Sequence, residues 1–221
     1  MPYLVSPIQV QQSIGGLSGN QSTTTGTETI KLTAMMDSVH SRIEELLNVR
    51  SLERLAYVDT FGIPSGRRRS SESLRLTAGF VRTDAPIQVL DSFGDALNED
   101  LLSVDHENGI INVNTTLSGT YKVSYVAGFA VANESIGEGH WQVYADAPQW
   151  LSGIVYTLAV QWFRVVALRP NLPDNVNYRA LLDALYREVA ARIYSRYMRP
   201  RFDVHFPRKM VVTPFDADAE S

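Results

Sequence analysis

The chain contains no cysteine among its 221 residues. Disulfide bonds, thiolate metal sites and cysteine nucleophiles are therefore excluded. The N-terminal residues MPYLVSPIQVQQ include neither a basic region nor a long apolar region, so they do not resemble a secretory signal. The longest mostly apolar stretch, residues 150–168, carries Gln161 and Arg164, which are costly in lipid. We expect this stretch to be a helix buried in protein, and we expect no membrane association.

Sequence motifs of enzymes are also missing. There is no phosphate-binding loop and no dinucleotide fingerprint, and GIPSG at 62–66 has the wrong spacing for a nucleophile elbow. The acidic run at 91–100 does not have the spacing of a calcium loop, so we interpret it as a solvated loop. The histidines lack the spacing of a metal-ligand set; they are His40, His106, His140 and His205. We therefore expect no enzyme activity, no metal and no cofactor.

Charge is distributed unevenly along the chain. Residues 1–163 carry 10 basic and 17 acidic side chains, whereas residues 164–209 carry 10 basic and 4 acidic ones. Adjacent blocks of opposite sign suit a protein that packs against copies of itself or against a charged partner. The alternative is a solvated, arginine-rich helix face, which has the same pattern.

Three helices are predicted from periodicity and capping. The first begins near Thr25, which has capping-box spacing with Glu28, and runs to about Asn48. Its apolar stripe consists of Leu32, Met36, Val39, Ile43 and Leu46. The second and third helices, residues 146–168 and 175–198, are separated by a loop with two prolines and should pack as an antiparallel hairpin.

Between the first and second helices, residues 51–145 predict a small, mostly antiparallel sheet of about five strands. Apolar and polar residues alternate there, and turn sequences separate the alternating runs. Among these turns, Asn108-Gly109 predicts a hairpin. We therefore predict an α+β fold, in which the sheet is an insertion into a helical domain made of residues 27–50 and 146–198.

Two terminal segments are predicted to be extended arms. Residues 1–26 are rich in Ser, Thr, Gly and Gln, so we expect them to be ordered only by a partner. Residues 199–221 contain Pro207 and Pro214, together with apolar side chains that so short a segment does not bury by itself. We expect this arm to lie on another surface, of its own subunit or of a partner.

Three consecutive arginines, Arg67, Arg68 and Arg69, are predicted to lie in an exposed loop between strands. Such a loop can contact DNA phosphates or another subunit through non-specific electrostatics, or it can simply be a soluble hairpin tip. No aromatic residues interleave with the arginines, so a platform for stacking single-stranded bases is not expected.

The segments GTYKVSYVAGFA at 119–130 and DAPQWL at 146–151 resemble a pattern of head–tail adaptor (connector) proteins of tailed bacteriophages. In that pattern a strand of the form V-x-Y-x-A-G-F/Y closes a small sheet, and an Asp or Pro then leads into a long helix that begins with an aromatic-Leu pair. The matching residues are Val123, Tyr125, Ala127, Gly128, Phe129, Pro148, Trp150 and Leu151. The order of the predicted elements also fits, so the resemblance covers roughly residues 27–198. The sheet insertion and the C-terminal arm are longer than in the shorter members.

The resemblance implies a structural virion protein of the phage neck, assembled in the host cytoplasm. Members of the family form a ring, commonly of twelve subunits, between the portal and the next neck or tail protein. The ring extends the channel through which genomic DNA passes without sequence-specific contacts. The C-terminal segment typically binds the portal, and here its expected contacts are Arg199, Arg201, Phe202, Phe206, Arg208, Lys209 and Phe215. The acidic remainder of the subunit would line the channel.

Three other classes remain as alternatives at this point, and one of them is a membrane-associated protein that uses residues 150–168. The chain can be another neck component, such as a stopper or a tail terminator, although those proteins are usually dominated by sheet. A small hydrolase acting on glycan or nucleic acid is the third, because dispersed carboxylates carry no sequence signature.

Overall fold

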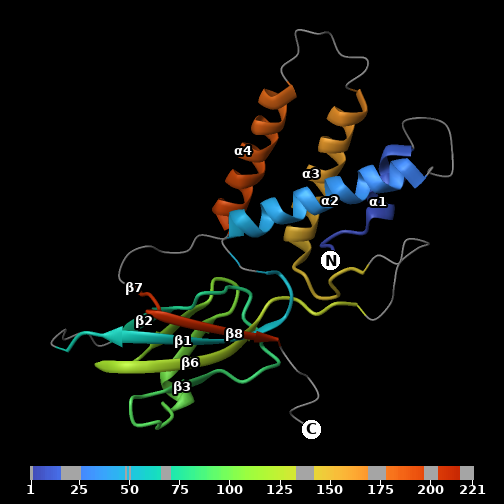
Figure 1. The fold of residues 1–221 in the computed structure, drawn as a ribbon. Helices are drawn as coiled ribbons and strands as arrows, with labels where there is room; N and C mark the ends of the chain where they lie inside the picture. The colour runs from blue at the N-terminus through green and yellow to red at the C-terminus, as the bar shows by residue number, and fades with distance from the viewer. Residues whose placement is uncertain are drawn as a thin grey trace. The chain divides into compact units, whose positions relative to one another are not determined.

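The protein has an α+β fold that divides into two compact units (Figure 1). The first, here called the helical unit, comprises Met1–Leu47 and Ala130–Arg196; the second, the β unit, comprises Asn48–Phe129 and Tyr197–Ser221. A computed structural model describes residues 2–15, 26–47, 49, 51–65, 71–132, 142–168, 178–196 and 204–214. The fold class agrees with the sequence prediction.

Within its described residues the helical unit contains four helices: α1 (Pro7–Gly15), α2 (Gly26–Leu47), α3 (Gln149–Leu168) and α4 (Tyr178–Arg196). The last three lie within a few residues of their predicted bounds. On α2 the buried residues are Met36, Val39, His40, Ile43 and Leu47. The stripe therefore ends at Leu47, and Leu46, which was assigned to it, is only half-buried. Leu47 lies four residues after Ile43 and therefore on the same face of the helix, which continues the buried stripe.

Helices α3 and α4 lie side by side in the helical unit, as expected for a hairpin (Figure 1). The Trp162 and Tyr186 rings meet edge to face with centroids 5.3 Å apart, a favoured aromatic geometry. The guanidinium of Arg42 on α2 lies 5.1 Å from the Tyr186 centroid, so α2 also contacts this pair. Val189 and Ile193 of α4 are buried, in agreement with the predicted stripe.

The first residues do not form the expected extended arm. Tyr3 is buried; its N–H donates to Gln142 O (2.9 Å), and its carbonyl accepts from the Tyr144 N–H (3.0 Å). Pro7 then begins α1, where its missing N–H costs no hydrogen bond. The prediction followed the Gly- and Ser-rich composition of the whole segment and gave too little weight to the apolar residues near its start, which are Tyr3, Leu4, Val5 and Val10. Residues 16–25 lie outside the described part of the chain.

The described part of the β unit forms two four-stranded sheets rather than one sheet of about five strands. The first has the order β3-β6-β1-β8, with the strands Gln88–Leu90, Gly119–Ala127, Leu55–Ile63 and Lys209–Pro214. The second has the order β4-β5-β2-β7, with the strands Leu102–Asp105, Ile110–Val113, Glu72–Arg75 and Val204–His205. A short 3-10 helix, η1 (Glu99–Leu101), precedes β4. All pairs are antiparallel except β2 with β7.

Strand β1 was missed by the sequence analysis although it is central to its sheet. It pairs over nine residues with β6, from Leu55 opposite Ala127 to Ile63 opposite Gly119. Its inward positions are Tyr57, Asp59, Phe61 and Ile63. Asp59 interrupts the apolar alternation that predicts a strand, since a carboxylate at a core position is normally excluded.

The carboxylate of Asp59 is fully buried and accepts three hydrogen bonds. The donors are the Thr77 N–H (2.7 Å), the Thr77 hydroxyl (2.8 Å) and the Tyr125 hydroxyl (2.9 Å). Burial raises the pKa of Asp59 above its usual range, while the bonds from Thr77 and Tyr125 act in the opposite direction. Burial and the nearby Asp59 raise the pKa of Tyr125. The network joins β1, β6 and the segment after β2, so its role is structural.

Two glycines hold the ends of β-strands in conformations that other residues rarely adopt. Gly109 has a φ of 63° in the turn between β4 and β5, which confirms the predicted hairpin. Gly128 has a φ of 99° directly after β6, and a Cβ there would overlap the carbonyl oxygen of Glu53. The following residue, Phe129, packs its ring 5.0 Å from that of Phe80.

Candidate docking surfaces

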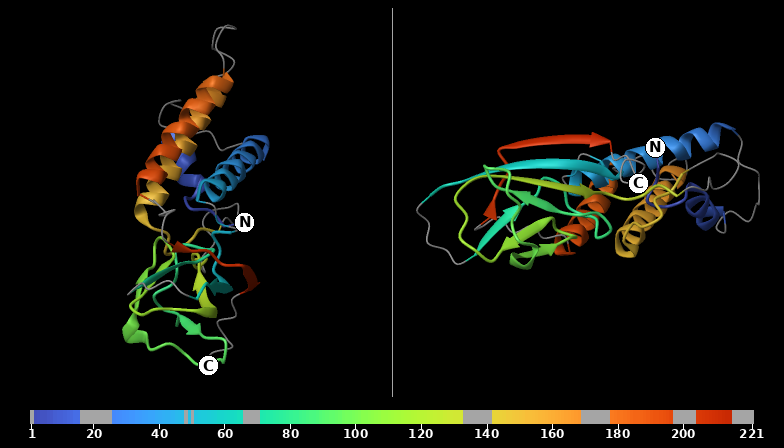
Figure 2. Two further views of the ribbon diagram at one scale, coloured as in Figure 1. Left: turned by 90° about the vertical axis from the view of Figure 1, so that its left-hand side faces the viewer. Right: turned by 90° about the horizontal axis from the view of Figure 1, so that it is seen from below.

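The described part of the C-terminal segment is paired with the sheets of its own β unit. Strand β8 lies antiparallel to β1, from Leu55 opposite Pro214 to Thr60 opposite Lys209, and Figure 2 shows the two strands side by side. Strand β7 lies parallel to β2. The sheets have open edges at β1 and β2, and the tail satisfies the backbone groups there. The arm was expected to lie on a surface of its own subunit or of a partner, and its described residues lie on their own subunit.

A buried carboxylate fixes β7 to its sheet. The Glu72 side chain on β2 is enclosed, and its Oε2 lies 2.8 Å from Nε2 of His205 on β7. The other oxygen, Oε1, has no hydrogen-bond partner among the described residues. Because an unpaired buried carboxylate is costly, the contact with His205 favours the docked position of β7.

Arg208 is also directed toward its own subunit. Arg208 lies between β7 and β8, and its backbone N–H donates to the Thr60 carbonyl of β1 (2.6 Å). The guanidinium lies against Gly62, where a Cβ would overlap it. The absence of a side chain at Gly62 thus makes room for Arg208, which the sequence analysis assigned to a partner contact.

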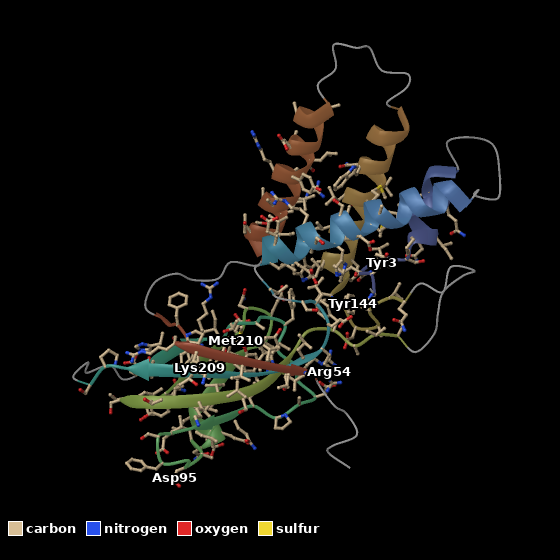
Figure 3. All side chains as sticks on the ribbon, in the orientation of Figure 1. Tyr3, Arg54, Asp95, Tyr144, Lys209 and Met210 are labelled. Atoms are coloured by element: carbon tan, nitrogen blue, oxygen red, sulfur yellow. The ribbon has the colours of Figure 1, made fainter. Side chains whose placement is uncertain are left out.

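The outward part of the docked segment is apolar and basic. Phe206 is 51% exposed, and its ring lies 5.4 Å from the Arg75 guanidinium. Lys209, Met210 and Val211 follow, all exposed, and Figure 3 shows Lys209 and Met210 on β8. Because β8 ends the order of its sheet, one edge of this strand has no neighbour within the described residues. We call Phe206 and Lys209–Val211 the arm surface.

Other residues of the predicted sites cannot be placed. Arg67, Arg68 and Arg69 lie outside the described residues, as do four members of the expected portal-binding set, namely Arg199, Arg201, Phe202 and Phe215. Phe206, Arg208 and Lys209 are thus the members of that set for which the structure gives contacts.

A second surface was not identified from the sequence. Phe93, with 89% of its surface exposed, lies in the turn of the acidic loop 91–100, whose Asp95 is labelled in Figure 3. The charge of this loop predicts a solvated segment, and that prediction takes no account of the single aromatic residue within it. The signal that could have found it is a Phe between Ser92 and Gly94 in a turn, where an aromatic side chain has no core to enter.

The described histidines His40 and His106, which could take part in chemistry, do not share a site. His40 lies in the helical unit, with its ring 6.3 Å from that of Tyr3 and 6.0 Å from that of Tyr144. His106 Nδ1 lies 3.1 Å from the carbonyl oxygen of Val81 in the β unit. Within the described ranges, no three His, Asp or Glu side chains are grouped so that they could hold a metal ion. No helix in those ranges is both apolar and long enough to cross a lipid bilayer.

Comparison of the sequence with protein-family models and with curated proteins finds no match.

Proposed function

We propose that this chain is a head–tail adaptor of a tailed phage, a structural protein that forms a ring between the portal and the tail. In this proposal the helical unit is the adaptor core, residues 48–129 of the β unit are an insertion into it, and the rest of the β unit contains the C-terminal arm. The proposal rests on the resemblance of residues 119–151 to such adaptors. Its partners are the portal, the next neck or tail protein, further copies of the chain, and the DNA in the channel.

The observation that carries the proposal is the geometry of that resembling segment. It forms β6, turns at Gly128 with a φ of 99°, and then leads into α3. Pro148 accepts hydrogen bonds from the N–H groups of Leu151 (2.9 Å) and Ser152 (3.1 Å) through its carbonyl, so it lies at the helix entry as the pattern requires. Gly128 and Pro148 of the pattern thus each have a physical reason at their positions.

The balance of elements favours an adaptor over a stopper or tail terminator. In the described ranges, the four helices comprise more residues than the eight strands. A neck protein dominated by sheet would have the opposite balance. A hydrolase is not favoured by any observation, because the buried carboxylates of Asp59 and Glu72 are each bonded within the fold.

The portal contact is proposed to be the arm surface in its docked position. The arm needs no release to present Phe206, Met210 and Val211, since these are exposed while β7 and β8 remain paired. Aromatic residues and methionine are enriched in protein interfaces, and a charged group such as Lys209 suits the polar rim around them. The resemblance assigns the portal to this end of the chain.

Binding to the portal of the same phage tests the proposal. The full chain is mixed with purified portal, and the mass of the complex is measured after size-exclusion chromatography. We expect several copies of the chain on each portal ring. Phe206→Ser and Lys209→Ala should each weaken binding about tenfold, because each removes part of the arm surface.

The matched control is Lys122→Ala, which removes an exposed lysine from β6 and should bind like the unaltered chain. Absence of any complex between the unaltered chain and the portal contradicts the proposal. Equal weakening by Lys122→Ala would instead show that net charge, and not the arm surface, determines binding.

A further inference from the structure

The loop that carries Phe93 is held by its own hydrogen bonds. Asp91 Oδ1 accepts from the N–H groups of Phe93 (2.8 Å) and Asp95 (3.0 Å). The Asp91 N–H donates to Asp95 O (2.9 Å), and the Gly94 N–H donates to Asp91 O (3.2 Å). Gly94 completes the turn with a φ of 89°, which favours glycine. The tip is therefore pre-organised, and little conformational entropy is lost if it binds.

Phe93 is the most exposed large apolar residue in the described part of the chain. At 89% exposure, it contributes nothing to the core of its own subunit. Removal of a phenylalanine side chain from water is favourable, so cover of Phe93 by a partner stabilises the contact. A rigid tip that presents one aromatic side chain has the properties of an interface anchor.

The outward face of α4 offers a complementary surface. Five of its exposed residues recur at intervals of three or four and thus lie along one face; they are Leu181, Ala184, Arg187, Ala191 and Tyr194. Leu181 is 41% exposed and Tyr194 is 53% exposed. The small side chains of Ala184 and Ala191 leave room between the larger ones for an aromatic ring. Tyr194 supplies a stacking partner, and Arg187 supplies a cation for the ring.

The charges of the two surfaces are opposite. The loop 91–100 contains four acidic side chains and no basic one. Helix α4 contains four arginines and two acidic side chains, one of which, Glu188, is paired with Arg192 at 2.5 Å. Arg187 forms no ion pair within the described residues, so it is available to the loop carboxylates. Opposite charges at the rim promote association and set the register of the two surfaces.

We propose that the Phe93 loop of one copy docks on the outward face of α4 of a second copy. This inference rests on the proposed function, since it specifies how subunits of the ring contact each other. The two surfaces are different, so the contact is head-to-tail and leaves one free surface of each kind on every pair of copies. Contacts of this type generate closed rings when the rotation between neighbours closes.

Self-association of the full chain measures the role of Phe93. Sedimentation velocity over a hundredfold range of concentration gives the association constant. We expect Phe93→Ser to lower it at least tenfold, because the ring is the anchor and its loss leaves the fold unchanged at so exposed a position. The matched control is Phe206→Ser, which removes an exposed aromatic residue from the arm surface and should associate like the unaltered chain.

A charge exchange tests which surface receives the loop. Asp95→Arg alone and Arg187→Asp alone should each weaken association, because each places like charges together. A mixture of the two variants should regain association, since each then offers the other a matched pair of surfaces. Rescue in a mixture is not expected from a change in folding.

Cross-linking establishes that the contact is between copies. The natural chain has no cysteine, so introduced thiols are the only ones present. A mixture of Ser92→Cys, which keeps the Phe93 anchor, with Ala191→Cys should give cross-linked dimers with a short bismaleimide. A mixture of Ser92→Cys with Lys122→Cys, whose second thiol lies on β6, should give few.

The outcomes separate the interface from the proposed function. Tenfold weakening by Phe93→Ser, with rescue by the charge exchange and the selective cross-link, supports the interface. Association that does not change with substitutions on either surface overturns the interface and leaves the adaptor proposal in place. The same conclusion follows if the chain stays monomeric alone but assembles on the portal equally well with and without Phe93→Ser. Failure of the unaltered chain to bind the portal overturns the adaptor proposal by itself.

Discussion

The two units of the molecule place their carboxylate side chains differently. The β unit encloses the carboxylates of Asp59 and Glu72, and their partners come from distant parts of the chain. The helical unit keeps its ion pair Glu188–Arg192 in solvent and bonds the Tyr3 hydroxyl to Asp37 at a part-buried position. An enclosed polar group is costly to leave without a partner, whereas a solvated one is not. We therefore expect the β unit to be far more sensitive to loss of a polar contact.

The largest effect is expected from Asp59→Ala. The substitution leaves the Thr77 N–H, the Thr77 hydroxyl and the Tyr125 hydroxyl without their acceptor in a buried site. The β unit should lose about 3 kcal/mol or more of unfolding free energy. Hydrogen exchange of β1 and β6 amides measures this loss. All three tryptophans lie in the helical unit, at positions 141, 150 and 162, so their fluorescence serves as the internal control.

The pH dependence of stability in Asp59→Asn tests whether the enclosed carboxylate of Asp59 has a raised pKa. Burial raises the pKa of Asp59 in the folded state, so its contribution to stability is complete below the unfolded pKa and is lost as the pH rises through the folded value. The asparagine variant lacks this titration. The stability difference between the unaltered chain and the variant should therefore shrink as the pH rises above about 4. A difference that grows with pH would contradict a raised pKa.

A smaller effect, about 2–3 kcal/mol, is expected from Gly128→Ala. The new methyl group would overlap Glu53 O, and the φ of 99° is unfavourable for alanine. Gly119→Ala separates these causes, since Gly119 has a φ of 98° with open space around it. Gly153→Ala on α3 is the control, and it should stabilise the helical unit by up to about 1 kcal/mol. Thermal unfolding followed by circular dichroism compares the three variants.

Tyr3→Phe in the helical unit should cost only about 1 kcal/mol. It removes the hydroxyl that donates to Asp37 Oδ1 at 2.7 Å, but it keeps the ring beside His40. Figure 3 shows Tyr3 and Tyr144 in this unit. Asp37 lies at the surface end of the bond, so water can replace the donor. A loss as large as that from Asp59→Ala would remove the distinction between the units.

The smallest effect is expected from Asp84→Asn, a solvated contact within the β unit. Arg82 donates to both oxygens of Asp84 (2.9 and 2.8 Å), and these bonds lower the pKa of Asp84 to about 2. Its contribution is present above the unfolded pKa of about 3.9 and is lost as the pH falls toward 2. Because half of the Asp84 side chain is exposed, solvent screening limits this contribution to at most about 1 kcal/mol. Urea unfolding at pH 7 and pH 2.5, with and without 0.5 M salt, measures this contribution to the free energy of unfolding. A cost above that of Tyr3→Phe would show that the unit in which a contact lies, and not the burial of the contact, determines its energy.

The sequence predicted the helical unit better than the β unit. Periodicity and caps act over a few residues, so the bounds of α2, α3 and α4 could be found without knowledge of the fold. Strand β1 could not be found in this way, because Asp59 is acceptable at an inward position only when Thr77 and Tyr125 are folded beside it. Strands β7 and β8 depend on open sheet edges that exist only after folding.

The candidate surfaces show the same division. The apolar and basic character of Phe206 and Lys209 was visible in the sequence, but it gave no sign that Arg208 turns toward Thr60 and Gly62. The sequence indicated the acidic loop but not the exposure of Phe93, because a phenylalanine in a short segment is equally consistent with a core residue and with an exposed one.

The sequence by itself determined the α+β class, three helices, the Asn108-Gly109 hairpin and the absence of thiol chemistry, because each depends on composition or on neighbours along the chain. The tertiary structure alone decided that two sheets form and that the C-terminal residues are docked on them. It also decided that the tip at Phe93 and one face of α4 are left uncovered. These features depend on pairing between distant segments, and burial of each group follows from what the rest of the chain places around it.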